Sequence, residues 1–237
     1  MIYIFLILVV FYQRSQLAKR NRPLRQAKII TKTFDTPLGS VVCGVVSDCN
    51  KMRLVGQKKY ENGHSEIFET VGYQIELIEF KIKQPLYNGL TITDSCGWIW
   101  KIEKRNNKNE ALGTFCLFEQ PTGAVQYSPV CGEHLDAVEI CNENWSLCIG
   151  TEDGEVLNGR AEYEDEFPKR FNYKVNLSES ITRLETNGLK TQIPELDKGE
   201  ILHLQYLVAY DKSENDNSWL AVDEDKQKLE DWIGIEQ

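Results

Sequence analysis

The sequence predicts an all-β fold, an antiparallel sandwich or barrel-like body, with a hydrophobic helix at the N-terminus and a short helix at the C-terminus. Composition is the first observation: 41% of the residues are hydrophobic and 27% are charged, which is typical of a globular chain. The second is that residues 28 to about 219 form short β-branched and aromatic runs between turn residues, without a helical period. We expect a β-rich unit over residues 28–167 and a C-terminal β-sandwich-like unit over residues 168–237, although residues 28–237 can also form one domain.

An unbroken apolar run, MIYIFLILVVFY, opens the chain at Met1–Tyr12. As a helix this run covers about 18 Å, and its continuation through Ala18 covers about 27 Å of a hydrocarbon core about 30 Å thick, provided that Arg14 snorkels. A signal peptide needs positive charge before the run, and a core element needs alternation with polar residues. We therefore predict a membrane-anchor helix and basic collar over residues 1–27, with a signal sequence, a core element or a true start upstream as alternatives.

The charge around this run predicts its orientation. Six basic residues and no acidic one occupy the first 28 positions, all of them after the apolar run: Arg14, Lys19, Arg20, Arg22, Arg25 and Lys28. The positive-inside rule then predicts a single-pass membrane protein that contacts the lipid bilayer through residues 1–28 and keeps its C-terminal domain cytoplasmic. An odd number of cysteines, seven, also favours a reducing compartment.

The rest of the chain is acidic. The whole protein has a net charge of −9 and the first 28 residues carry +6, so the remaining body carries −15. Duplex binding draws much of its energy from neutralising phosphates, and we therefore expect no nucleic-acid partner.

Several strands and turns are predicted in the first part of the body. Ser40–Val46 follows the turn Thr36–Gly39 and reads as a central strand, because it is almost continuously apolar. Tyr73–Ile82 alternates with one phase slip, which predicts a β-bulge between Leu77 and Ile78.

Three turn sequences divide the next stretch. Asp94–Gly97 predicts a hairpin turn between Leu90–Thr93 and an alternating strand in which Trp98 and Trp100 belong to the core. Ala137–Cys141 and Trp145–Ile149 flank a compact loop and predict a second hairpin, and Thr151–Gly154 predicts the next turn. The polar run Lys104–Asn109 predicts an exposed loop, and residues 171–177 alternate again.

The C-terminal stretch predicts an antiparallel pair closed by a helix. Ile201–Tyr210 reads as an inner strand with Leu202, Leu204, Tyr206 and Val208 toward the core, while the face with Gln205 is expected to be partly solvated. Trp219–Val222 would form its partner strand. Asp223–Ile233 predicts a short helix capped by Asp223 or Asp225 and ended by Gly234, with Leu229, Trp232 and Ile233 on one side.

Motifs that carry chemistry are sparse. Cys131, His134 and Asp136 crowd together, and a nucleophilic thiol needs a base within hydrogen-bond reach, so Cys131 and His134 are the candidate catalytic pair. With three histidines and no C-x-x-C, no metal site is expected, and His203 is interpreted as a hydrogen-bonded strand residue. No phosphate-binding loop is present, so no cofactor is expected.

These observations predict a function class. The anchor, the acidic β-rich body and the lack of a catalytic signature favour a membrane-tethered, non-enzymatic protein whose cytoplasmic domain binds a protein partner. The alternative is a membrane-localised, thiol-dependent hydrolase centred on Cys131 and His134.

Overall fold

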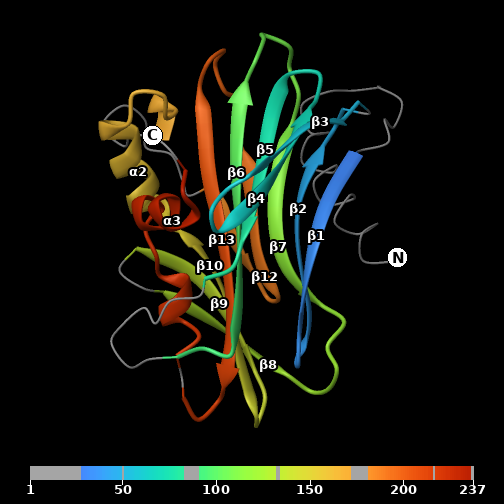
Figure 1. Ribbon diagram of the computed structural model, residues 1–237, viewed down its shortest axis with the longest axis vertical. Helices are drawn as coiled ribbons and strands as arrows, with labels where there is room; N and C mark the ends of the chain where they lie inside the picture. The colour runs from blue at the N-terminus through green and yellow to red at the C-terminus, as the bar shows by residue number, and fades with distance from the viewer. Residues whose placement is uncertain are drawn as a thin grey trace.

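The computed structural model describes residues 28–49, 51–82, 91–131, 134–171, 181–215 and 217–235. Two antiparallel β-sheets dominate these residues, and two short helices lie together beside β13 and β10, away from β1 and β2 (Figure 1). The prediction of a mostly antiparallel β body is confirmed. The predicted N-terminal helix and collar, residues 1–27, lie outside the described residues.

The smaller sheet has five strands and the larger has eight. The order in the smaller sheet is β1 (Lys28–Thr36), β2 (Gly39–Ser47), β7 (Leu112–Glu119), β12 (Gly188–Ile193) and β11 (Thr182–Glu185). The order in the larger sheet is β3 (Arg53–Lys59), β4 (Gly63–Glu69), β5 (Tyr73–Phe80), β6 (Asp94–Lys104), β13 (Ile201–Lys212), β10 (Trp145–Glu152), β9 (Leu135–Cys141) and β8 (Gln126–Cys131). The helical elements are α2 (Gly154–Tyr163), η2 (Lys169–Phe171), η3 (Leu220–Val222) and α3 (Lys226–Ile233).

The main core lies between the two sheets. Val41, Cys43 and Val45 of β2 point into it, since alternate residues of a strand share a face, and β2 is a central strand as expected. Trp98 and Trp100 are both fully buried, which confirms their place in the core. The indole Nε1 of Trp100 lies 3.4 Å from the Cys43 sulfur across the two sheets.

A second core covers the other face of the larger sheet. In β5, Ile75 and Leu77 join the inter-sheet core, whereas Ile78 and Phe80 join a cluster that includes Leu229 of α3. The register of β5 is continuous against both β4 and β6, so the predicted bulge is wrong. Both faces of β5 are buried, so neither face requires polar residues. The hydrophobic pattern can therefore shift from one face to the other without a bulge.

The predicted turn at Asp94–Gly97 is also wrong, because these residues are the first four of β6 and pair with β13. Gly97 is required by packing: a Cβ at this position would lie 2.3 Å from the Phe80 ring. The glycine at position 97 therefore marks the close approach of the Phe80 side chain, and not a turn. Most of the expected partner segment, residues 83–90, lies outside the described residues.

The hairpin of β9 and β10 is confirmed, with Ser146 opposite Cys141. The turn expected at Thr151–Gly154 is wrong, since β10 continues to Glu152 and Asp153 caps α2 by accepting hydrogen bonds from the backbone of Glu155 and Val156. This helix has a weak amphipathic pattern, and its polar side chains are used in buried contacts, so the periodicity did not reveal it.

The C-terminal prediction is partly confirmed. β13 places Leu202 and Leu204 in the inter-sheet core, but Gln205, on the face expected to be solvated, is only 2% exposed. The expected strand Trp219–Val222 contains the short 3-10 helix η3. α3 is capped by Asp225 and ends at Gly234 with φ of 83°, as predicted.

Two further segments differ from expectation. Arg105 and its neighbours form the exposed loop, but Lys104 is buried at the end of β6, where its ammonium donates to the backbone oxygen of Lys108 and lies over the Tyr73 ring. Phe171 belongs to η2, and residues 172–180 lie outside the described residues. Within the part of the chain that the structure describes, no helix is both long and apolar enough to cross a membrane.

Candidate functional site: a polar layer beneath the helices

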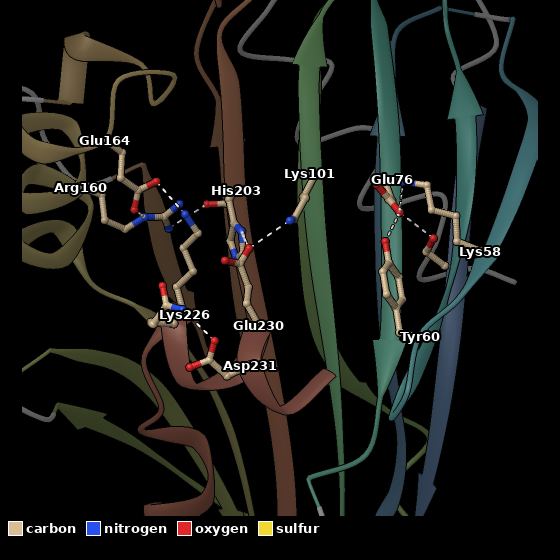
Figure 2. Close-up of polar contacts among 12 residues, drawn as sticks. Lys58, Tyr60, Glu76, Lys101, Arg160, Glu164, His203, Lys226, Glu230 and Asp231 are labelled. Carbon is tan, nitrogen blue, oxygen red and sulfur yellow. Dashed lines mark hydrogen bonds and ion pairs between the residues drawn. The ribbon is translucent and has the colours of Figure 1, made fainter. Parts of the chain in front are cut away.

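A layer of charged and polar side chains lies on the helix-covered side of the larger sheet. Figure 2 shows it as two groups, one around Arg160, His203 and Glu230 and the other around Glu76. The residues come from α2, α3 and six strands of the larger sheet, so only the folded chain assembles them.

Arg160 of α2 is the centre of the first group. Its guanidinium donates to the Glu152 carboxylate at 2.6 Å, to the Glu164 carboxylate at 2.9 Å and to the backbone oxygen of His203 at 3.1 Å. Its Cζ also lies 4.4 Å from the centre of the Phe167 ring. One side chain thus ties α2 to β10 and β13, and the planar guanidinium suits such a set of acceptors.

Glu164 continues this group to α3. Its carboxylate accepts a hydrogen bond from Lys226 at 2.8 Å. Burial raises the pKa of Glu164, but the hydrogen bond from Lys226 and the charge of Arg160 outweigh burial, so the pKa is lowered overall. The acidic run 162–166, which alone would read as a solvated face, therefore includes a residue that bridges two helices.

His203 and Lys101 face Glu230 of α3. The Lys101 ammonium lies 3.0 Å from the Glu230 carboxylate, and the His203 Nδ1 lies 3.6 Å from the same oxygen. Neither ring nitrogen of His203 has a hydrogen-bond partner among the described residues, so the expected hydrogen-bonded histidine is not found. Burial, together with the charges of Arg160 and Lys226, holds the pKa of His203 well below its usual value, and the ring is neutral at pH 7.

Gln205 lies two residues further along the same face of β13. Its side-chain amide donates to the backbone oxygen of Glu224 at 2.7 Å, which joins the sheet to the segment before α3. Gln205 therefore has a defined structural role, and its position is not a solvated one.

The second group is centred on Glu76 of β5. Its carboxylate accepts hydrogen bonds from Ser65 at 2.6 Å, from Tyr60 at 2.8 Å and from Lys58 at 3.2 Å. Burial raises the pKa of Glu76, yet these three hydrogen bonds lower it overall. Burial and the hydrogen bond to Glu76 raise the pKa of Tyr60 to about 12.

The ion pairs of the first group hold α2 and α3 against the larger sheet. Each charged side chain of the first group has an oppositely charged neighbour, and the pairs join the sheet to α2 and α3. His203 is only 3% exposed, so its neutral imidazole cannot meet a substrate unless α3 moves. Within the described residues, no group of three or more potential ligand side chains could hold a metal ion.

Of the candidate pair, Cys131 lies in β8, the edge strand next to β9, and His134 lies beside the start of α2. Cys131 ends β8 opposite Asp136 of β9, residues 132–133 are outside the described residues, and nothing is described of the Cys131 side chain. His134 is exposed and lines an open hollow with Glu155, Val156 and Asn158 of α2. The pairing of the thiol with the imidazole therefore stays a prediction.

Edge strand β3 presents apolar side chains to solvent. Leu54 is 51% exposed and Val55 is 43% exposed. Among the described residues β3 pairs with β4 alone, and a register shift leaves Val55 without a partner on β4. An open edge with apolar side chains is a template for pairing with another chain.

Comparisons with known proteins add no identity: no family model matches this chain, and no significant match is found among curated proteins or solved structures. Sequence reasoning missed Arg160 and Glu230 as central residues of the polar layer. The signal for Arg160 was present in the cap Asp153 and in the spacing of Arg160 and Glu164, which are four residues apart. The partners of Glu230 come from distant strands, and no local pattern indicates them.

Proposed function

We propose that this protein is a membrane-tethered, non-enzymatic β domain that binds a protein partner. The observation that carries partner binding is the open edge of β3 with Leu54 and Val55 exposed. An extended segment of the partner would add to this edge as a further strand, since backbone hydrogen bonds give affinity and apolar side chains give specificity in this mode.

The other three edges are less suited to strand addition. β11 has only four residues, and β8 contains Pro129, which lacks a backbone donor. β1 has its aromatic residue, Phe34, in the core and presents Thr31 and Thr33 to solvent. β3 is seven residues long and combines exposed apolar side chains with a free edge.

Charge indicates the chemistry of the partner. Arg53, Lys58 and Lys59 are exposed residues of β3 on a body that is otherwise strongly acidic. Arg53 and Lys58 bind the carboxylates of Glu69 in β4 and Glu76 in β5, and Lys59 adds an exposed positive charge at the end of β3. We expect an acidic, β-branched segment of the partner to fit this edge. A basic segment would be attracted to the whole acidic body and not to this edge in particular.

The tether is carried by the sequence alone. The apolar run Met1–Tyr12 would insert into the bilayer, and the basic collar would hold the domain at the anionic, cytoplasmic face, at about 1 kcal/mol per basic residue near the surface. The runner-up function, a thiol-dependent hydrolase, is supported by the hollow beside His134.

Partner binding is tested with the full chain and a library of displayed peptides. We expect the selection to enrich acidic, β-branched peptides whose binding is lost in Val55→Asp, because the new carboxylate repels them. Leu184→Asp, at a similarly exposed position of β11, is the matched control and should bind the peptides normally. Equal binding by Val55→Asp and the unmodified protein would contradict the β3 site.

The tether is tested separately by flotation with anionic vesicles in high salt. Salt removes purely electrostatic attachment and leaves an inserted helix in place. We expect the full chain to float with the vesicles in high salt. Recovery of all the protein in the soluble fraction would contradict the tether and leave the peptide result unaffected.

A further inference from the structure

An apolar stripe lies on the outer face of the smaller sheet, the face that points away from the inter-sheet core. Val41, Cys43 and Cys116 point inward, so their neighbours in the strands point outward. The outward apolar side chains are Ile29 of β1, Val42 and Val46 of β2, and Phe115 and Leu117 of β7.

These side chains are adjacent across the three strands. Val46 lies opposite Ile29 on one side, and Val42 lies opposite Leu117 on the other. Phe115 lies opposite Gly44, where a Cβ would come within 2.6 Å of the ring, so the ring lies against the β2 backbone. The stripe is therefore continuous across the three strands.

The burial of the stripe exceeds what its described neighbours provide. Phe115 and Leu117 are each 3% exposed, yet the apolar residues that pack on them are Ile29 and Val42, both in adjacent strands of the same sheet. Neighbours on a sheet face shelter a side chain from the sides and not from above. The two described helices pack elsewhere: α3 joins the cluster on the larger sheet, and α2 joins the inter-sheet core.

We propose that the apolar run Met1–Tyr12 docks on this stripe when no bilayer is present. The chain enters the sheet beside the stripe, since β1 begins at Lys28 and Ile29 is part of the stripe. The fifteen intervening residues, 13–27, span up to about 50 Å when extended, which is ample to return the run to this face.

The dimensions of the run and the stripe agree. Three neighbouring strands are about 10 Å across, and the four-residue step from Val46 to Val42 is about 13 Å along the strand. A twelve-residue helix is about 18 Å long and about 10 Å wide. One helical segment therefore covers the stripe, and both apolar surfaces leave water together.

This docking goes beyond the proposed function and does not require it. If the tether also exists, the bilayer and the stripe compete for the same run, and insertion of the run into a membrane exposes Phe115 and Leu117. The outer face would then become available only at the membrane.

Photo-crosslinking in the full chain tests the docking. p-Benzoylphenylalanine replaces Val42 on the stripe, and in a matched control it replaces Glu143, which lies in the exposed loop between β9 and β10. We expect the Val42 probe to crosslink to peptides from residues 1–12 within the same molecule, with a yield independent of dilution, and the Glu143 probe not to. Leu8→Glu in the run should abolish the crosslink while the thermal melt stays cooperative.

The other outcomes overturn the proposal. A crosslink to residues 172–180, a crosslink between two copies that weakens on dilution, or no crosslink to residues 1–12 would each place a different occupant, or none, on the stripe. Anionic vesicles separate this proposal from the tether: flotation without a crosslink in the vesicle-free sample contradicts docking alone, whereas a crosslink without flotation contradicts the tether alone.

Discussion

The guanidinium of Arg160 and the carboxylate of Glu152 form an ion pair of 2.6 Å, with 8% and 6% of their side chains exposed. The pair joins α2, which the sequence pattern did not reveal, to the end of β10. Removing one partner of a buried pair leaves an uncompensated charge, which costs more than the pair itself contributes.

Arg160→Leu should therefore lower the free energy of unfolding by about 3–5 kcal/mol, the range for breaking a buried pair. Urea denaturation at pH 7 measures the change. Arg53→Leu is the control, since the Arg53 pair with Glu69 is exposed and its loss should cost about 1 kcal/mol or less. Equal losses in the two variants would show that Arg160 has no special role, and Arg160→Leu combined with Glu152→Leu should recover part of the stability.

Glu76→Gln should reduce the dependence of stability on pH in acid. The pKa of Glu76 is lowered in the folded protein, so its contribution is fully present above the unfolded value of about 4.5 and is lost as the pH falls through the lower, folded value. The stability difference between the unmodified protein and the variant should thus be largest at neutral pH and shrink below pH 4.5. Urea titrations across this range measure it, and Glu69→Gln, on an exposed pair, is the control.

Gln205→Asp should unfold the protein as readily as Leu204→Asp, although the two positions lie on opposite faces of β13. Gln205 is 2% exposed and donates to the Glu224 backbone oxygen, and a carboxylate there loses the donor and is buried without a partner. Thermal melts compare both variants with Gln57→Asp on exposed β3. A normal melt for Gln205→Asp would mean that this face of the sheet is open to solvent.

Cys131 should react with a mild electrophile no faster than an ordinary thiol below pH 8, and Cys131→Ala should cost about 1 kcal/mol, the centre of single-mutant effects. Cys148 provides the internal control, because burial raises the pKa of its thiol and suppresses the thiolate. Peptide mapping after labelling identifies the modified cysteine. Saturable labelling of Cys131 alone would contradict the non-enzymatic proposal and favour the hydrolase.

The sequence patterns predicted an element correctly where the residues that determine it all lie within one short stretch. The β9–β10 hairpin follows from its compact loop, and α3 follows from the cap Asp225, the apolar spacing and Gly234. α2 was missed because its first turn resembles a hairpin turn, and because Arg160 is stabilised by residues of other elements and not by an apolar stripe. The candidate pair Cys131 and His134 remains a prediction.

The sequence by itself determined the antiparallel β class, the central position of β2, the buried tryptophans and the terminal helix, because alternation and capping act between near neighbours. Tertiary structure alone decided that the larger sheet is covered on both faces. Because both faces are covered, β5 is buried on both sides of the phase slip at Leu77. Gly97 lies against the Phe80 ring, and Gln205 is a buried hydrogen-bond donor. These outcomes depend on which elements, distant in the sequence, pack over a strand. The residues of the strand alone do not indicate which elements these are.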